Sequence, residues 1–118
     1  MITQEDIDAF SVWQNIGMTD YQEVASDTAI YPPENEIIYP ALGLAAEAGE
    51  VANKVKKILR DDAFDKDAIA DEVGDCLWYI AALCRDLGVD MSEIALNNIK
   101  KLQDRKQRGK LQGNGDKR

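Results

Sequence analysis

The 118-residue sequence contains no histidine, and this absence limits the chemistry available to the protein. Ser-His-Asp and Cys-His catalytic arrangements, a histidine general base and the usual zinc hydrolase sites are all excluded. Catalysis would have to depend on carboxylates, lysine, tyrosine or a metal ion. Because oxygen atoms are then the available ligands, a hard cation, Mg²⁺ or Mn²⁺, is favoured.

Cysteines and long apolar runs are also scarce. Cys76 and Cys84 lie eight positions apart in one apolar segment, and on a helix this spacing separates them by about 12 Å, too far for a disulfide. We expect both thiols to be reduced and buried, with a redox pair as the alternative. No run of about 18 apolar residues suggests a membrane span. The acidic residues 1–6 do not resemble a signal peptide, so we expect a cytoplasmic protein.

Length and charge predict one globular domain with an unusual tail. A chain of 118 residues can build one core, so residues 1–118 are treated as a single domain. Residues 97–118 carry eight basic and two acidic side chains, a local charge of +6 in a chain whose net charge is −8. Three glycines interrupt residues 109–118, which predicts an irregular basic tail after an acidic body.

The spacing of apolar residues predicts an all-α protein without strands. Helices are expected over about 4–16, 21–29, 40–60 and 66–87, with a last helix from Asp90 to about Gln107. Three prolines mark a loop near residues 31–39. These lengths suit a four-helix bundle. So many apolar helical positions in a short chain predict that some are buried in an oligomer interface.

Capping signals define several helix ends. Thr19 or Asp20 is expected to cap the helix that begins near Tyr21. Asp90 and Glu93 form an Asp-x-x-Glu variant of the capping box, and Gly88 has the position expected of a residue just past a helix C-terminus.

Two carboxylate pairs stand out in apolar segments: Glu47 with Glu50, and Glu72 with Asp75. A spacing of three places both members of a pair on one helix face, where like charges repel. The residues one turn away from Glu47 include no basic side chain that would relieve this repulsion.

Each pair also contains a glycine before its second acid, Gly49 in the first and Gly74 in the second. Glycine inside a helix costs about 1 kcal/mol relative to alanine, which suggests that the two helices approach closely here. If they pack antiparallel, four carboxylates converge and a divalent cation would relieve their repulsion. The alternative is an ordinary solvated acidic face.

With these pairs the sequence resembles the MazG-like all-α nucleoside triphosphate pyrophosphohydrolases. That family is characterised by a Glu-x-x-Glu helix followed by a Glu-x-x-Asp helix. The surrounding segments are similar as well: Asp20–Gln22, Tyr39–Leu44, Cys76–Tyr79 and Asp104–Gly109. The resemblance covers the chain from about Thr19 onward. Ala46 departs from it, because many members have an additional glutamate at that place.

The resemblance implies a helical bundle assembled as a homodimer or homotetramer. It also implies hydrolysis of a nucleoside triphosphate between its α- and β-phosphates, which yields the monophosphate and pyrophosphate. Glu47, Glu50, Glu72 and Asp75 are then expected to bind Mg²⁺ and to be the catalytic residues.

An anionic substrate needs positive charge and a nucleoside contact nearby. Lys54 and Lys57 follow Glu50 on the same helix, and Tyr79 falls one turn after Asp75. A third group lies at helical spacing on the last helix. The expected substrate-binding residues are therefore Lys54, Lys57, Tyr79, Asn98, Lys101 and Arg105. Solvated charges and, for Tyr79, core packing are the alternatives; Trp78 is expected in the core or an interface.

Two other functions remain open. The first is a non-catalytic acidic helical module whose basic tail binds nucleic acid or a partner protein; this leaves the carboxylate pairs without a role, so a nucleic-acid partner is not favoured. The second is a helical metal buffer or di-metal oxidase, against which the absence of histidine argues.

Overall fold

The computed structural model describes residues 3–5 and 15–118, and this part of the chain contains helices and no strand. The α-helices are α2 (Met18–Ser26), α3 (Ile38–Asp61), α4 (Lys66–Asp86) and α5 (Met91–Gln107), with a short 3₁₀ helix, η2 (Pro33–Asn35), before α3. The expected all-α class is confirmed for the described residues. The helix expected over 4–16 lies largely outside them.

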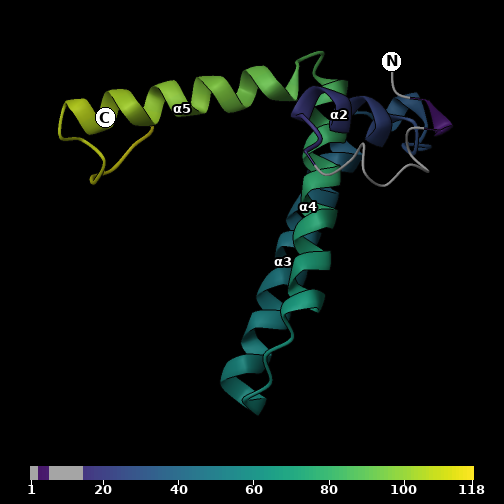
Figure 1. The fold of residues 1–118 in the computed structure, drawn as a ribbon, viewed down its shortest axis with the longest axis horizontal. Helices are drawn as coiled ribbons and strands as arrows, with labels where there is room; N and C mark the ends of the chain where they lie inside the picture. Colours follow the sequence, from purple (N-terminus) through teal and green to yellow (C-terminus); the bar gives the residue numbers. More distant parts are fainter. Residues whose placement is uncertain (1–2, 6–14) are drawn as a thin grey trace.

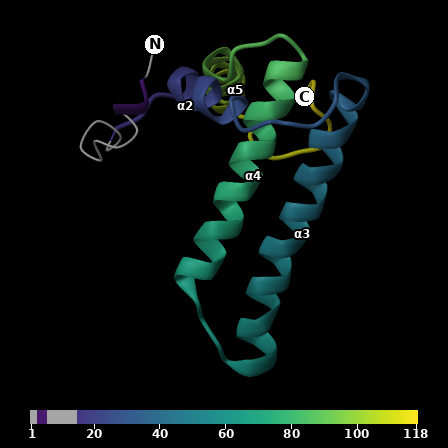
Figure 2. The same cartoon turned by 90° about the vertical axis from the view of Figure 1, so that its right-hand side faces the viewer.

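The helices α3 and α4, the two longest in the described part of the chain, form an antiparallel hairpin (Figures 1 and 2). Their bounds agree with the expected 40–60 and 66–87 to within two residues. Pro40 lies in the first turn of α3, where backbone N–H groups have no partner within the helix. The N–H that proline lacks therefore costs the helix no hydrogen bond. Asp65 caps α4 by accepting a hydrogen bond of 3.0 Å from the Ala68 N–H.

The helices α2 and α5 lie across one end of this hairpin. The shorter α2 packs on α4, and α5 runs crosswise to the hairpin and away from it (Figure 1). A single chain therefore does not close its four helices into the expected bundle. Closure by a second chain stays a prediction.

The corner between α4 and α5 has the expected glycine. Gly88 has a φ of +70°, and its N–H donates to the Arg85 carbonyl while the Val89 N–H donates to the Cys84 carbonyl. This pair of bonds is the Schellman motif that ends many helices. Asp90 caps α5 as expected, but its carboxylate accepts the Ser92 N–H at 2.9 Å and not the N–H of Glu93.

The expectation for the start of α2 was wrong. The helix begins at Met18, and Gly17 is the N-cap residue without a side-chain hydrogen bond. Thr19 does not cap it, because its hydroxyl donates instead to the Asp90 carboxylate at 3.1 Å. Thr19 therefore bonds to a residue 71 positions away in the sequence and not to the backbone of its own helix.

The buried core lies where α2, α4 and α5 meet. Its buried members are Ala25, Ala81, Cys84 and Met91, and Tyr21, Trp78, Ile80 and Val89 pack against them. Trp78 is half-buried and packs against the core, which is one of the two placements expected for it. Both cysteines are free; Cys84 is buried, whereas Cys76 is only half-buried. None of the described helices combines the length and the hydropathy that a membrane span requires.

Candidate metal centre

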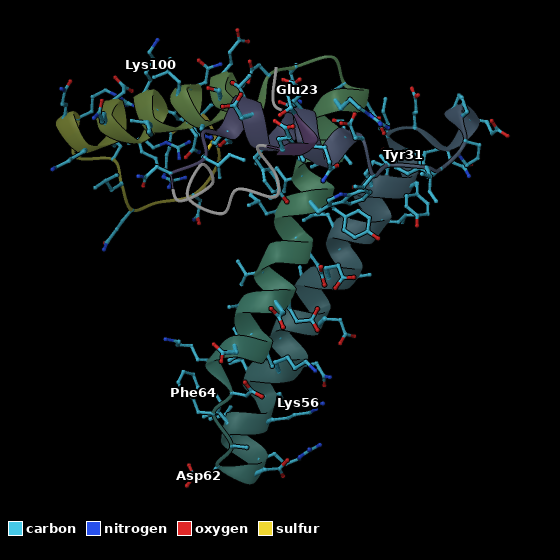
Figure 3. All side chains as sticks on the ribbon, turned by 45° about the vertical axis from the view of Figure 1, so that its right-hand side comes forward. Glu23, Tyr31, Lys56, Asp62, Phe64 and Lys100 are labelled. Carbon is cyan, nitrogen blue, oxygen red and sulfur yellow. The ribbon has the colours of Figure 1, made fainter. Side chains whose placement is uncertain are left out.

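Three of the four expected ligands come together between α3 and α4. Glu47, Glu72 and Asp75 each offer one carboxylate oxygen, and these oxygens all lie within 4.8 Å of one another. Figure 3 shows oxygen-bearing side chains of the two helices turned toward each other midway along the hairpin. We call these three residues the carboxylate cluster. The antiparallel register produces it, because Glu47 comes from α3 and the other two from α4.

The negative charges of the carboxylate cluster are not balanced by a neighbouring cation within the described residues. Partial burial, a hydrogen bond with Glu72 and the charges of Asp75, Glu72 and Glu50 raise the pKa of Glu47 above its ordinary value. In the described part of the chain, no ion pair joins a cluster carboxylate to a lysine or arginine.

Glu50 lies outside the carboxylate cluster. It is exposed and sits one turn further along α3 than Glu47. Its negative charge acts on Glu47, but it is not among the residues whose oxygens lie within 4.8 Å of one another. An exposed side chain one turn away is close enough for a change of rotamer to bring it nearer. Its role as a ligand stays a prediction.

The roles expected for Gly49 and Gly74 were wrong. No atom lies within 4 Å of a Cβ placed at either position, so neither glycine is needed for the approach of α3 and α4 within one chain. Gly43 has that role. A Cβ there would overlap Cε1 of Tyr79, so the tyrosine ring occupies the space that only glycine leaves open.

A row of tyrosines adjoins the carboxylate cluster. The rings of Tyr31 and Tyr39 stack with centroids 4.7 Å apart, and the Tyr39 and Tyr79 centroids are 6.3 Å apart. Burial, the neighbouring Tyr39 and the negative charges of Glu47 and Asp75 raise the pKa of Tyr79. Tyr79 packs on Gly43, whereas Tyr39 is 45% exposed.

Sequence reasoning gave Tyr39 and Gly43 no role, although a signal was present. Tyr39, Gly43 and Glu47 recur every four residues and therefore share one face of α3. Asp75 and Tyr79 have the same spacing on α4. The spacing places these residues on the faces that carry the carboxylates, but only the register of the two helices shows that Gly43 lies opposite Tyr79.

Lys54 and Lys57 lie on α3 beyond Glu50, toward the turn of the hairpin, and both are half-buried. The positive charge of Lys57 helps to lower the pKa of Asp61, after the hydrogen bond from Arg60. Neither lysine forms an ion pair within the described residues. Both are therefore available to a ligand.

The three residues expected on the last helix lie elsewhere. Asn98, Lys101 and Arg105 belong to α5, which points away from the hairpin (Figure 1). Asn98 is exposed, and Lys101 and Arg105 both bind Asp116 of the tail. The single chain does not bring these residues to the carboxylate cluster.

The donor set fits a divalent cation. Three carboxylates supply oxygen ligands only, they face one another across two helices, and Glu47 has a raised proton affinity in the absence of positive charge. Hard cations such as Mg²⁺ and Mn²⁺ prefer such donors. Fold and site together define an all-helical protein with a candidate divalent-metal centre.

The chain belongs to the MazG nucleotide pyrophosphohydrolase family. The model of the MazG nucleotide pyrophosphohydrolase domain matches residues 40–109, which contain the whole carboxylate cluster. The resemblance found in the sequence is thereby confirmed. Divalent-metal dependence is typical of this family.

A phage protein is similar over most of its length. The Gene 37 protein of Mycobacterium phage L5 is 47% identical over 109 residues, which cover 83% of this chain and 96% of that protein. No solved structure was found to match the chain.

Proposed function

We propose that this protein is a Mg²⁺-dependent nucleoside triphosphate pyrophosphohydrolase. It would cleave a (deoxy)nucleoside triphosphate between the α- and β-phosphates and release a monophosphate and pyrophosphate. The observation that carries this proposal is the carboxylate cluster, which lies inside the region typical of the family. Mn²⁺ is the expected substitute, since it accepts the same oxygen ligands.

The carboxylates have two tasks in this proposal. Glu47, Glu72 and Asp75 hold the metal, and Glu50 completes the set from the next turn of α3. When bound, Mg²⁺ supplies neutralisation of the phosphate charge and a site for the attacking water. One of the four carboxylates accepts the proton of that water.

Substrate contacts follow from the surroundings of the carboxylate cluster. Lys54 and Lys57 are unpaired cations on the face of α3 that also carries Glu47 and Glu50, and they would attract the phosphates. The exposed ring of Tyr39, with Tyr79 behind it, offers a surface on which a base or sugar can stack. Asn98, Lys101 and Arg105 would reach the same substrate from α5 of a second copy in the expected dimer or tetramer.

The test is pyrophosphate release from a panel of canonical and damaged nucleoside triphosphates with Mg²⁺, repeated with EDTA. Glu72→Gln and Asp75→Asn should each lower the rate about a hundredfold, because each removes a charged metal ligand. Asp71→Asn is the matched control, since Asp71 is exposed on the same helix and outside the carboxylate cluster. Circular dichroism checks that each variant keeps its helices.

Metal-independent release, or none from any nucleotide, would contradict the proposal. The second result would favour the non-catalytic module with a basic tail. An absorption band in the visible range after iron addition would favour the oxidase.

A further inference from the structure

Tyr31 ties the connection between α2 and α3 to the end of α4. It lies near the start of α3, at the end of the hairpin opposite Asp62 and Phe64 (Figure 3). Its hydroxyl donates to Asp86 Oδ2 at 2.6 Å and accepts from Arg85 Nη2 at 3.0 Å. The Arg85 guanidinium also lies over the Tyr31 ring, 5.3 Å from its centroid. The tyrosine is therefore held both at its hydroxyl and at its ring.

The Tyr31 ring in turn supports Tyr39. The two rings stack with their centroids 4.7 Å apart and an angle of 27° between their planes. Tyr39 lies in the first turn of α3, and the N–H of Ile37 just before that helix donates to Asp86 Oδ2 at 3.0 Å. One buried carboxylate oxygen therefore holds both the backbone that leads into Tyr39 and the ring that stacks on it.

Tyr39 is the ring of this row that a ligand can reach most easily. It is exposed, whereas Tyr31 is half-buried and Tyr79 packs on Gly43 between the two helices. Tyr39 and Glu47 lie on one face of α3, two turns apart. A nucleotide bound through its phosphates at the carboxylate cluster can therefore extend its base toward Tyr39.

We propose that Tyr31 is a positioning residue, which holds the ring of Tyr39 in the orientation that stacks on the base of a bound nucleotide. The inference rests on the proposed function, since it takes the substrate to be a nucleotide. Without its aromatic neighbour, the exposed Tyr39 side chain would sample several rotamers in the free protein. Binding would then have to fix that side chain, and the lost rotamer freedom would weaken the affinity for the nucleotide.

The experiment is a calorimetric titration of the full chain with two ligands in the presence of Mg²⁺. One is the tightest binder among the α,β-methylene analogues of the canonical deoxynucleoside triphosphates, which cannot be cleaved between the α- and β-phosphates. The other is inorganic tripolyphosphate, which has no base. Tyr31→Leu should bind the nucleotide analogue about fivefold more weakly than the wild type and tripolyphosphate equally well. A general loss of structure would weaken the binding of both ligands.

A double-mutant cycle shows whether Tyr31 acts through Tyr39. Tyr39→Leu removes the stacking ring and should weaken binding of the nucleotide analogue at least as much as Tyr31→Leu does. The double variant should bind it no more weakly than Tyr39→Leu, because the ring that Tyr31 positions has gone. Tyr31→Phe keeps the ring and its stacking, so it should remain within about twofold of the wild type.

Thr28→Val is the matched control. Thr28 belongs to the same connection, and its hydroxyl accepts a hydrogen bond of 2.7 Å from Trp78 Nε1, so the variant loosens the connection without touching the stacked rings. It should bind both ligands as the wild type does. Circular dichroism checks the helices of each variant, and Tyr31→Met repeats the test with a longer side chain if Tyr31→Leu does not fold.

Equal weakening of both ligands in Tyr31→Leu would overturn the proposal, as would losses that add in the double variant. If Tyr31→Leu binds the nucleotide analogue normally while the wild type hydrolyses nucleotides, the role of Tyr31 is refuted and the proposed function stands. A wild-type protein that binds none of the nucleotide analogues would contradict both.

Discussion

At the scale of single residues, Gly43 and Tyr79 set the spacing between the two helices beside the carboxylate cluster. The ring of Tyr79 lies where a side chain at position 43 would begin. A small residue is needed there because the tyrosine must fit between α3 and α4. At Gly49 and Gly74 the surroundings are open, and helix propensity alone decides the effect of a substitution.

Alanine substitutions separate these glycines. Gly43→Ala should destabilise the fold by about 1–3 kcal/mol, as overpacking does, and should displace Tyr79 from the carboxylate cluster. Gly49→Ala and Gly74→Ala should each stabilise the chain by about 0.5–1 kcal/mol. Urea unfolding followed by circular dichroism measures all three. A loss of stability in Gly49→Ala or Gly74→Ala would show that a second chain uses that surface.

A second residue, Asp86, holds the loop before α3. Its side chain is 1% exposed, and it accepts hydrogen bonds from the Tyr31 hydroxyl at 2.6 Å and the Ile37 N–H at 3.0 Å. Ile37 has a φ of +68°, an unfavourable value for a β-branched residue. The hydrogen bond to Asp86 helps to hold that conformation.

Asp86→Asn should lower the free energy of unfolding at pH 7 by about 2–4 kcal/mol, since it removes a buried carboxylate that pairs with the half-buried Arg85. Asp61→Asn is the matched control. Asp61 likewise pairs with the preceding arginine, but in an exposed setting, and no measurable change is expected.

The effect of Asp86→Asn should depend on pH. Burial alone would raise the pKa of Asp86, but hydrogen bonds from Tyr31, Ile37 and Arg85 lower it overall. A lowered pKa adds stability above the pKa of the unfolded chain, about 3.9 for aspartate, and this is lost as the pH falls through the folded pKa. The difference between wild type and variant should therefore shrink in urea titrations repeated at acid pH. A constant difference would contradict this account.

At the scale of elements, the α3–α4 hairpin was largely predictable. Apolar periodicity determines where each helix runs, and the spacing of Glu47, Glu72 and Asp75 determines the face on which each lies. The register between the helices was not predictable, because it depends on the turn and on side-chain packing. That register pairs Gly43 with Tyr79 and leaves Gly49 and Gly74 open, which is why the sequence assigned the wrong glycines.

The hairpin should be stabilised by metal. Mg²⁺ in excess of its dissociation constant should raise the melting temperature by about 5–10 °C, because it binds the folded state alone. Glu72→Gln should remove this shift and Asp71→Asn should preserve it. Thermal unfolding with Mg²⁺ and with EDTA measures the difference. A shift that persists in Glu72→Gln would mean that the metal binds elsewhere.

At the scale of the whole molecule, the single chain is more open than a typical monomer of its size. Its radius of gyration is 17.2 Å, whereas a compact chain of this length has a value of about 13.5 Å. Its accessible surface is 8698 Å², against about 6,400 Å² for a typical monomer of this mass. Large apolar side chains remain exposed on α5, among them Ile94, Ile99 and Leu102.

We therefore expect a homodimer or homotetramer, and sedimentation equilibrium should give a multiple of 13.1 kDa. Ile99→Asp should weaken the assembly, because it places a charge in an apolar contact. Asn97→Asp adds the same charge on the opposite face of α5 and should leave the mass unchanged. A wild-type protein that sediments as a monomer would contradict the expectation. The sequence predicted an oligomer from its excess of apolar positions but could not show which helix would project.

The contacts at the corner between α4 and α5 limit how far α5 can move. The Gln22 side chain donates to the Val89 carbonyl at 2.9 Å and accepts from the Met91 N–H at 2.7 Å, so one residue of α2 spans the whole connection. Thr19 adds a second bond to Asp90. The direction of α5 is thus held by contacts with α2 as well as by the four-residue connection formed by residues 87–90. Any swing of α5 would have to break these contacts or carry α2 with it, so the two helices are expected to move as one unit.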